Sequence, residues 1–142
     1  MSDYSISLYS ECPDTIQQIA ISTLEQIFSD DLEGRPIKPS DYEKFWIIHD
    51  NTTFIGSISL DNNVPGISPC IGNLYIDESK RRNGYGSKLI DLAEEYALKT
   101  LNAHTIYLWC REDVKSYYEK RGYSMMRIYP PGFIMWKFIR DY

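Results

Sequence analysis

The sequence carries a strand-to-helix junction at Arg81-Arg82-Asn83-Gly84-Tyr85-Gly86. Upstream, Leu74-Tyr75-Ile76 is typical of the end of a strand, and downstream apolar residues recur at helical spacing from residue 89 to residue 97. The first turn of a helix has N–H groups without intrahelical partners, and the helix dipole adds partial positive charge there. Because Gly84 and Gly86 lack a Cβ, an anion can approach these amides closely. The junction therefore predicts a phosphate site, with Lys80, Arg81, Arg82 and Lys88 adding positive charge.

Alone, such a short motif is equally consistent with a plain turn that carries solvated basic residues. A second block favours the phosphate site: Ile106-Tyr107-Leu108-Trp109-Cys110, followed by Tyr117-Tyr118-Glu119-Lys120-Arg121-Gly122-Tyr123. Together the two blocks resemble the GNAT superfamily of acetyl-CoA-dependent N-acetyltransferases. That family carries Arg/Gln-x-x-Gly-x-Gly/Ala after a strand, and later a strand followed by aromatic-Tyr-Glu-Lys-x-Gly-aromatic. The resemblance covers residues 54–126 and reaches the N-terminal third by element order.

The resemblance implies a fold, a cosubstrate and a reaction. The fold would be α+β, the three-layer α/β GNAT fold, with a mixed, mostly antiparallel central sheet of about seven strands flanked by helices. The enzyme would transfer an acetyl group from acetyl-CoA directly to a primary amine of a small molecule or a protein. The cosubstrate would bind at Leu74, Tyr75 and Ile76, whose backbone would meet the pantetheine arm, and at Arg81, Arg82, Asn83, Gly84, Tyr85, Gly86 and Ser87.

Tyr118 occupies the position of the family's catalytic tyrosine, which protonates the departing thiolate. A phenol has a pKa of about 10 and a thiol one of about 8.5, so the transfer costs roughly 2 kcal/mol. The alternative interpretation is that Tyr118 packs with Val114 and Tyr117 on the inner face of a short helix. We expect the catalytic role because of its place in the second block.

The general base stays open at this point. Some GNAT members use a glutamate on the strand before the glycine loop, and the corresponding position is approximately Cys70, a poor base. Asp61, Asp77 and Glu112 are candidates, and a relay through ordered water is another. Arg111 and Glu112 stand where many members carry an asparagine.

Two other classes of function are alternatives to the enzyme. A catalytically silent acetyl-CoA-binding module would explain the missing glutamate. A nucleotide-phosphate enzyme would need Gly-Lys-Ser/Thr, but Gly86 is followed by Ser87 and Lys88. A covalent acyl-enzyme at Cys110 is disfavoured because no His or carboxylate pattern activates that thiol.

Composition sets further limits. We expect one domain over residues 1–142, because the chain is 43% hydrophobic and large enough for a core. A net charge of −5 argues against a nucleic-acid partner and suits a cationic amine. Cys12, Cys70 and Cys110 form no metal framework and suit a reducing compartment. Neither a membrane span nor a leader is evident, so we expect a cytoplasmic protein. We expect it to be a monomer or a homodimer.

Patterning predicts the individual elements, and the resemblance supplies their order. Strands are expected at 6–9, 45–48, 54–60, 71–76, 105–110, 123–129 and 133–139, and helices at 14–28, 84–100 and 113–121. Asp14 is expected to cap the first helix with Gln17 completing a capping box. That helix would bury Ile16, Ile19, Ala20, Leu24, Ile27 and Phe28. Residues 30–41 are expected to form a polar loop, which the resemblance places beside the acceptor site. Gly72-Asn73 is expected to mark a bulge or a point of close backbone approach.

Overall fold

The computed structural model describes residues 4–62 and 68–140. Met1, Ser2 and Asp3, on which the expectation about a leader partly rests, lie outside the described residues, as do both ends of the expected 1–142 domain. The strands are β1 (Ser5–Leu8), β2 (Lys44–His49), β3 (Phe54–Asp61), β4 (Cys70–Ile76), β5 (Thr105–Arg111), β6 (Ser124–Tyr129) and β7 (Gly132–Phe138). The helices are α1 (Asp14–Ile27), α2 (Ser29–Leu32), α3 (Tyr85–Lys99) and α4 (Lys115–Lys120). Single 3-10 turns lie at Tyr9–Glu11, Pro39–Asp41, Glu78–Lys80 and Glu112–Val114.

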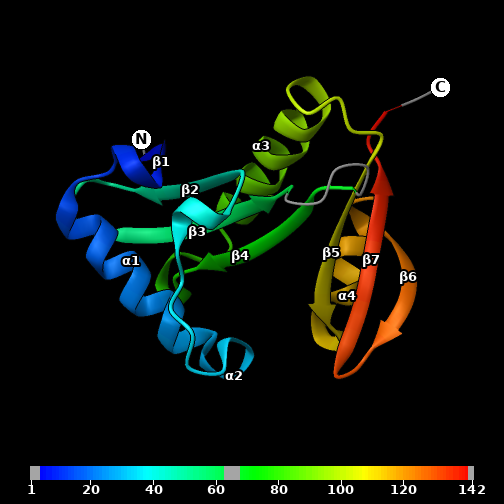
Figure 1. Ribbon diagram of the computed structural model, residues 1–142, viewed down its shortest axis with the longest axis horizontal. Coiled ribbons are helices and arrows are strands. Elements are labelled where there is room, and N and C mark those ends of the chain that lie inside the picture. The colour runs from blue at the N-terminus through cyan, green and yellow to red at the C-terminus, as the bar shows by residue number, and fades with distance from the viewer. Residues whose placement is uncertain (1–3, 63–67, 141–142) are drawn as a thin grey trace.

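The seven strands form one sheet in the order β1-β2-β3-β4-β5-β7-β6 (Figure 1). Neighbouring strands are antiparallel except β4 and β5, which are parallel. The predicted mixed, mostly antiparallel sheet is therefore confirmed, and so is the element order. The prediction that residues 30–41 form only a loop is wrong, because α2 and the turn Pro39–Asp41 lie partly within it. No helix in the described ranges combines the length and the apolar character needed to cross a bilayer.

The start of α1 also differs from the prediction. The helix begins at Asp14 with Pro13 as the N-cap residue, and no side chain caps it. The Gln17 amide instead donates to the carbonyl oxygens of Tyr9 at 2.9 Å and Cys12 at 3.1 Å. Gln17 therefore fastens the helix to the preceding turn, and the capping box is wrong.

The buried face of α1 is narrower than the pattern suggested. Ile16, Ala20 and Leu24 are fully buried, whereas Ile19 is 43% exposed and Ile27 is 51% exposed. A stripe repeating every four residues is enough to cover the sheet, so the residues flanking it face solvent. The expectation that Ile19 and Ile27 belong to the core is wrong.

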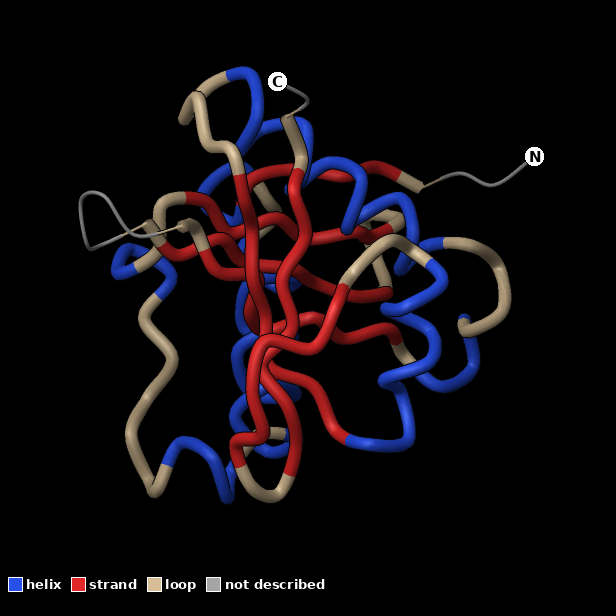
Figure 2. Tube along the Cα trace, turned by 90° about the vertical axis from the view of Figure 1, so that its right-hand side faces the viewer, coloured by secondary structure: helices blue, strands red, loops and turns tan. Residues whose placement is uncertain are grey.

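The sheet is covered on both faces. This explains why the sequence of strand β2 is almost continuously apolar. Phe45 and Ile47 pack with α1, while Trp46 and Ile48 pack with α3 in the second, larger core. A strand with two buried faces reads as a continuous apolar run, since alternate side chains enter opposite cores. Figure 2 shows helices on both sides of the sheet, and Figure 1 shows β5–β7 running across the direction of β1–β4.

Strands β4 and β5 part soon after they meet. They pair at Cys70 with Tyr107 and at Ile71 with Leu108, and the described strands have no paired residues beyond that point. On its other edge β4 follows β3, where the register shifts between Ser57 and Ser59. One residue of β3, Ile58, there opposes two residues of β4, Asn73 and Leu74. Of the two alternatives predicted for Gly72-Asn73, the bulge is the one present.

Side chains of β3 hold the bulge in place. Asn73 has a positive φ of 50°. Its carbonyl accepts a hydrogen bond from the Ser57 hydroxyl at 2.7 Å, and its side-chain amide donates to Ser59 Oγ at 2.9 Å. Both serines are fully buried, so these bonds satisfy groups that water cannot reach. The bulge bends β4 away from β5 and leaves the gap in which the candidate site lies.

Gly56 tests this packing directly. A Cβ at this position would lie 2.3 Å from the Tyr75 carbonyl oxygen, a backbone atom that cannot move aside without shifting β4. We expect Gly56→Ala to lower the free energy of unfolding by about 2–3 kcal/mol, as overpacking of a core does. Gly86→Ala is the matched control for stability, since its Cβ would meet only Ile76 Cγ1 at 3.8 Å. Thermal unfolding of both variants checks this; equal melting temperatures would contradict the role assigned to Gly56.

Candidate active site

Two cavities occupy the gap between β4 and β5. The first has a volume of about 600 Å³ and is lined by the end of β4, the strand-to-helix junction, β5 and α4. The second has a volume of about 470 Å³ and is lined by the first part of β4, the end of β3, β5 and the α1–α2 corner. Both cavities share Phe28, Asp31, Leu74, Trp109, Arg111, Val114 and Tyr118. They therefore adjoin along one border formed by these residues.

The junction between β4 and α3 has a shape fixed by its own side chains. Arg82 and Gly84 have positive φ values of 69° and 78°, which turn the chain into the helix. The Asn83 amide donates to the carbonyl oxygens of Lys80 at 2.9 Å and Arg81 at 3.3 Å, and Arg81 Nε donates to Ile76 O at 2.9 Å. Asn83 thus bonds within the loop and does not line the first cavity, in contrast to Arg81, Arg82, Gly84, Tyr85, Gly86 and Ser87.

The helix presents free amides to the first cavity. The amide of Lys88 bonds to the Gly84 carbonyl oxygen at 3.1 Å as the first turn closes. The amides of Tyr85, Gly86 and Ser87 precede that bond in α3 and lie where a helix has no internal acceptor for them. These three residues line the first cavity, so the helix N-terminus opens onto it. Such an end favours an anion.

The basic residues of the junction divide into two sets. Lys80, Arg81 and Arg82 line the first cavity. Lys88 is not among its lining residues; its ammonium bonds to the Tyr4 hydroxyl and lies 4.8 Å from the centre of that ring. The junction therefore contributes its positive charge to the first cavity through residues 80–82.

Tyr118 lies on the border of the two cavities. It is 9% exposed, and its ring packs edge-on against Tyr117 at 5.2 Å and Tyr123 at 5.8 Å between centroids. The packing alternative is therefore present, and the same side chain also lines both cavities. Burial, with smaller effects of Tyr117 and Cys110, raises the pKa of Tyr118 well above its ordinary value. The phenol therefore remains protonated, and the same shift makes it a weaker acid than a tyrosine in water.

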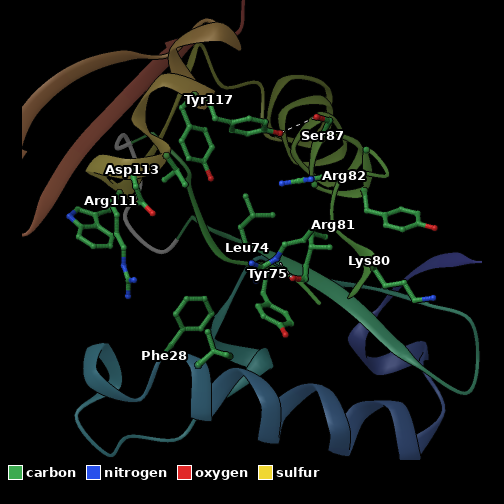
Figure 3. A pocket seen from close by; sticks show the side chains of 18 of the residues that line it. Phe28, Leu74, Tyr75, Lys80, Arg81, Arg82, Ser87, Arg111, Asp113 and Tyr117 are labelled. Carbon is green, nitrogen blue, oxygen red and sulfur yellow. Dashed lines mark hydrogen bonds between the residues drawn. The ribbon is translucent and has the colours of Figure 1, made fainter. Parts of the chain in front are cut away.

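Tyr117 links the two helices that flank the first cavity. Its hydroxyl and Ser87 Oγ are 3.0 Å apart, which joins α4 to the first turn of α3 (Figure 3). On the facing wall, Phe28 projects from the end of α1 toward the cavity (Figure 3). Sequence reasoning gave neither residue a place in the site. The aromatic position before Tyr118 in the second block was the available signal for Tyr117, and nothing in the sequence marked Phe28.

The candidate bases are placed apart from one another. Asp61 lines the second cavity, whereas Asp77 and Glu112 line neither cavity. The Asp77 carboxylate accepts from Ser79 N at 3.2 Å and caps the turn Glu78–Lys80. Asp31, which the sequence did not single out, lines both cavities. The described lining of the second cavity thus holds two carboxylates, Asp31 and Asp61.

The cysteines near the gap are poorly suited to catalysis. Burial raises the pKa of Cys70 to about 11, so this thiol is a poor base. Cys110 is buried with its sulfur 3.3 Å from Met135 Sδ, and burial raises its pKa as well. A protonated, buried thiol is a poor nucleophile, which argues against an acyl-enzyme.

Several large aromatic residues lie in different surroundings. Tyr42 and Trp109 line the second cavity, while Phe45 and Trp46 belong to the two cores. Trp136 packs against Phe138 with 5.1 Å between ring centroids. Within residues 4–62 and 68–140, no three His, Cys, Asp or Glu side chains lie together as metal ligands would.

Comparison with known proteins agrees with this geometry. No curated protein sequence matches the chain. Solved structures do match it: an acetyltransferase from Streptococcus agalactiae (TM-score 0.72, 19% identity, 97% of this chain and 99% of the other) and an acyl-CoA N-acyltransferase from Pseudomonas aeruginosa (0.73, 14%, 95% and 98%). A third is the PaiA N-acetyltransferase from Thermoplasma acidophilum in complex with coenzyme A (0.70, 17%, 97% and 99%).

The TM-scores of these three matches establish a shared fold. The sequence itself matches the profile of the acetyltransferase (GNAT) family over residues 11–123, which is most of its length. That match includes the glycine junction and Tyr118, the residues on which the expected resemblance rested. The chain belongs to the GNAT family of acetyltransferases.

Proposed function

We propose that the chain forms a single domain that transfers an acetyl group from acetyl-CoA directly to a primary amine. One observation carries the proposal: Tyr118, a protonated and buried phenol, lies on the border between a basic cavity and a cavity that contains two aspartates. A thioester in the first cavity and an amine in the second would meet at this border. Tyr118 is then placed to give its proton to the departing sulfur.

The first cavity would hold CoA. Its pyrophosphate would accept hydrogen bonds from the amides of residues 85–87 and from Arg81 and Arg82, each contributing roughly 1.5–3 kcal/mol. The pantetheine arm would lie along the edge of β4 that faces β5. Beyond Ile71 none of the described strands pairs with that edge, so the backbone of Leu74, Tyr75 and Ile76 can bond an extended ligand as an added strand would.

The amine nitrogen must lose two protons, and the departing sulfur must gain one. An aliphatic ammonium with a pKa of about 10.4 must lose its first proton to become nucleophilic, at ~4.6 kcal/mol at pH 7. We propose that this proton leaves through water in the second cavity, since Asp77 and Glu112 line neither cavity and Asp61 pairs with Cys70, four residues along β4 from Leu74. The amine nitrogen then forms a bond to the acetyl carbon, the C–S bond breaks, and Tyr118 donates its proton to the sulfur, so that CoA leaves as the thiol. The second proton of the nitrogen then passes to the tyrosinate and restores the phenol.

The alternative function is a silent acetyl-CoA-binding module, which would bind CoA and acetylate no acceptor. We favour the enzyme because Tyr118, although it belongs to the larger core, also lines both cavities. We also propose that the protein works in the cytoplasm, where its three free cysteines would stay reduced. The expectations of no nucleic-acid partner, and of a monomer or homodimer, stay predictions.

Binding of CoA should depend on Arg82 and not on Lys88. Arg82 lines the first cavity, whereas Lys88 lies in the same motif but contacts Tyr4. We expect Arg82→Gln to raise the Kd for CoA about 10-fold or more, through loss of a charge-assisted hydrogen bond to phosphate. Lys88→Gln, the matched control, should change it less than about 2-fold. Titration calorimetry measures both; equal effects would place the phosphates elsewhere.

Turnover should depend on the Tyr118 hydroxyl. We expect Tyr118→Phe to lower kcat about 10²- to 10⁴-fold at pH 7–9 with little change in CoA affinity, as loss of a general acid does. Because the pKa of Tyr118 is raised, wild-type kcat should show no decline from its ionisation below about pH 10. Tyr117→Phe, the control, removes the bond to Ser87 and should act mainly on the KM for acetyl-CoA.

The pH profile of kcat, followed by thiol release, decides the assignment. A Tyr118→Phe enzyme that keeps full kcat would refute the acid role. Tight CoA binding by the wild type with no turnover of any amine would favour the silent module.

A further inference from the structure

We infer that the acceptor carries a second cationic group beyond the reacting amine, as a diamine or polyamine does, and that Asp61 binds this distal ammonium. The inference rests on the proposed function, because it takes the second cavity as the acceptor site. It assigns that cavity a substrate class. Charge, distance and the character of the walls each support it.

The two cavities differ in the charge of their walls. The first is lined by Lys80, Arg81, Arg82 and Arg111 against two carboxylates, Asp31 and Asp113. The second is lined by Asp31 and Asp61 against Arg111. The first wall therefore favours an anion and the second a cation. Arg111 lies on the border and lines both cavities, so its charge would also act on a cosubstrate in the first.

Distance along β4 separates Asp61 from the reacting centre. Asp61 pairs with Cys70, whereas the thioester would lie at Leu74 and Tyr118, the border of the two cavities. Four residues of extended strand span roughly 13 Å, and the bulge shortens this somewhat. A single ammonium cannot contact Asp61 and also attack the thioester. A chain of several methylene groups with an ammonium at each end can do both.

The walls between these two points suit such a chain. Phe28, Tyr42 and Trp109 line the second cavity together with Ile71 and Leu108. Aromatic and aliphatic walls hold methylene groups, and aromatic faces also attract ammonium groups. Asp61 is only partly exposed, so an ion pair there is less screened than one in open water. The volume of about 470 Å³ is ample for a slender polyamine.

The test compares acceptors that differ only in the distal ammonium. Hexylamine is measured against 1,6-diaminohexane, and octylamine against 1,8-diaminooctane, with spermidine and lysine beside them, by thiol release from acetyl-CoA. We expect kcat/KM to be at least about 10-fold higher for the diamine of a pair. Asp61→Asn should remove that advantage by raising the KM for the diamine about 10- to 100-fold, with kcat and the monoamines changed less than about 3-fold.

Asp30→Asn is the matched control. Asp30 lies beside Asp31 on α2 but lines neither cavity, so its removal should leave the preference for diamines unchanged. The wild-type comparison within each pair needs no variant and stands even where Asp61→Asn lowers stability.

Three results separate the inference from the proposed function. CoA binding with no turnover of any acceptor would refute the acetyltransferase and this inference with it. Turnover in which a monoamine equals its diamine, or in which Asp61→Asn keeps the preference, would overturn the inference and leave the enzyme intact. 6-Aminohexanoate, measured in the same panel, has a carboxylate and no second ammonium. If it exceeded every diamine and lost that preference in Arg111→Gln, the inference would also be overturned and a carboxylate-bearing acceptor indicated.

Discussion

The separation of β4 from β5 is the constraint on which the rest of the site depends. The strands share two paired positions, and then the bulge at Asn73 bends β4 away. Parallel strands that stayed paired would fill the gap with backbone hydrogen bonds and leave no room for a ligand. The bend is held from β3 by Ser57 and Ser59, both buried and both bonded to Asn73. Gly56 allows the Tyr75 carbonyl to approach closely.

Each chemical feature of the site follows from this opening. The free edge of β4 offers backbone groups, and the chain then leaves β4 through a junction that aims the amides of α3 at the first cavity. Arg81 fastens the junction to the strand through Ile76, so strand and helix keep one relative position. From the other side, β5 continues into α4, which brings Tyr118 to the border of the two cavities. Basic side chains outnumber carboxylates around the first cavity, whereas carboxylates outnumber basic side chains in the described lining of the second.

Several features of the fold and the candidate site could be predicted from local sequence. The glycine junction, the bulge at Gly72-Asn73 and the inward position of Tyr118 were predictable because each depends on neighbours in the chain: a helix start, an interior glycine, a helical spacing. The width of the buried face of α1 was not predictable, since Ile19 and Ile27 are apolar yet lie beside the contact with the sheet. Gln17 was misread because its partners belong to the preceding turn.

The rest of the site arises from tertiary contacts that no local pattern encodes. Phe28 and Asp31 reach the cavities because α1 and α2 end there, and Tyr117 meets Ser87 only when α4 packs beside α3. The choice among Asp61, Asp77 and Glu112 likewise required knowing which side chain lines a cavity. Sequence could name the candidates, and only the folded chain could place them.

A crystal structure of the protein with CoA tests the central claim most directly. The account predicts the pyrophosphate against the amides of residues 85–87, the pantetheine along the open edge of β4, and the sulfur beside the Tyr118 hydroxyl. CoA bound with its sulfur away from Tyr118, or outside the gap between β4 and β5, would contradict it.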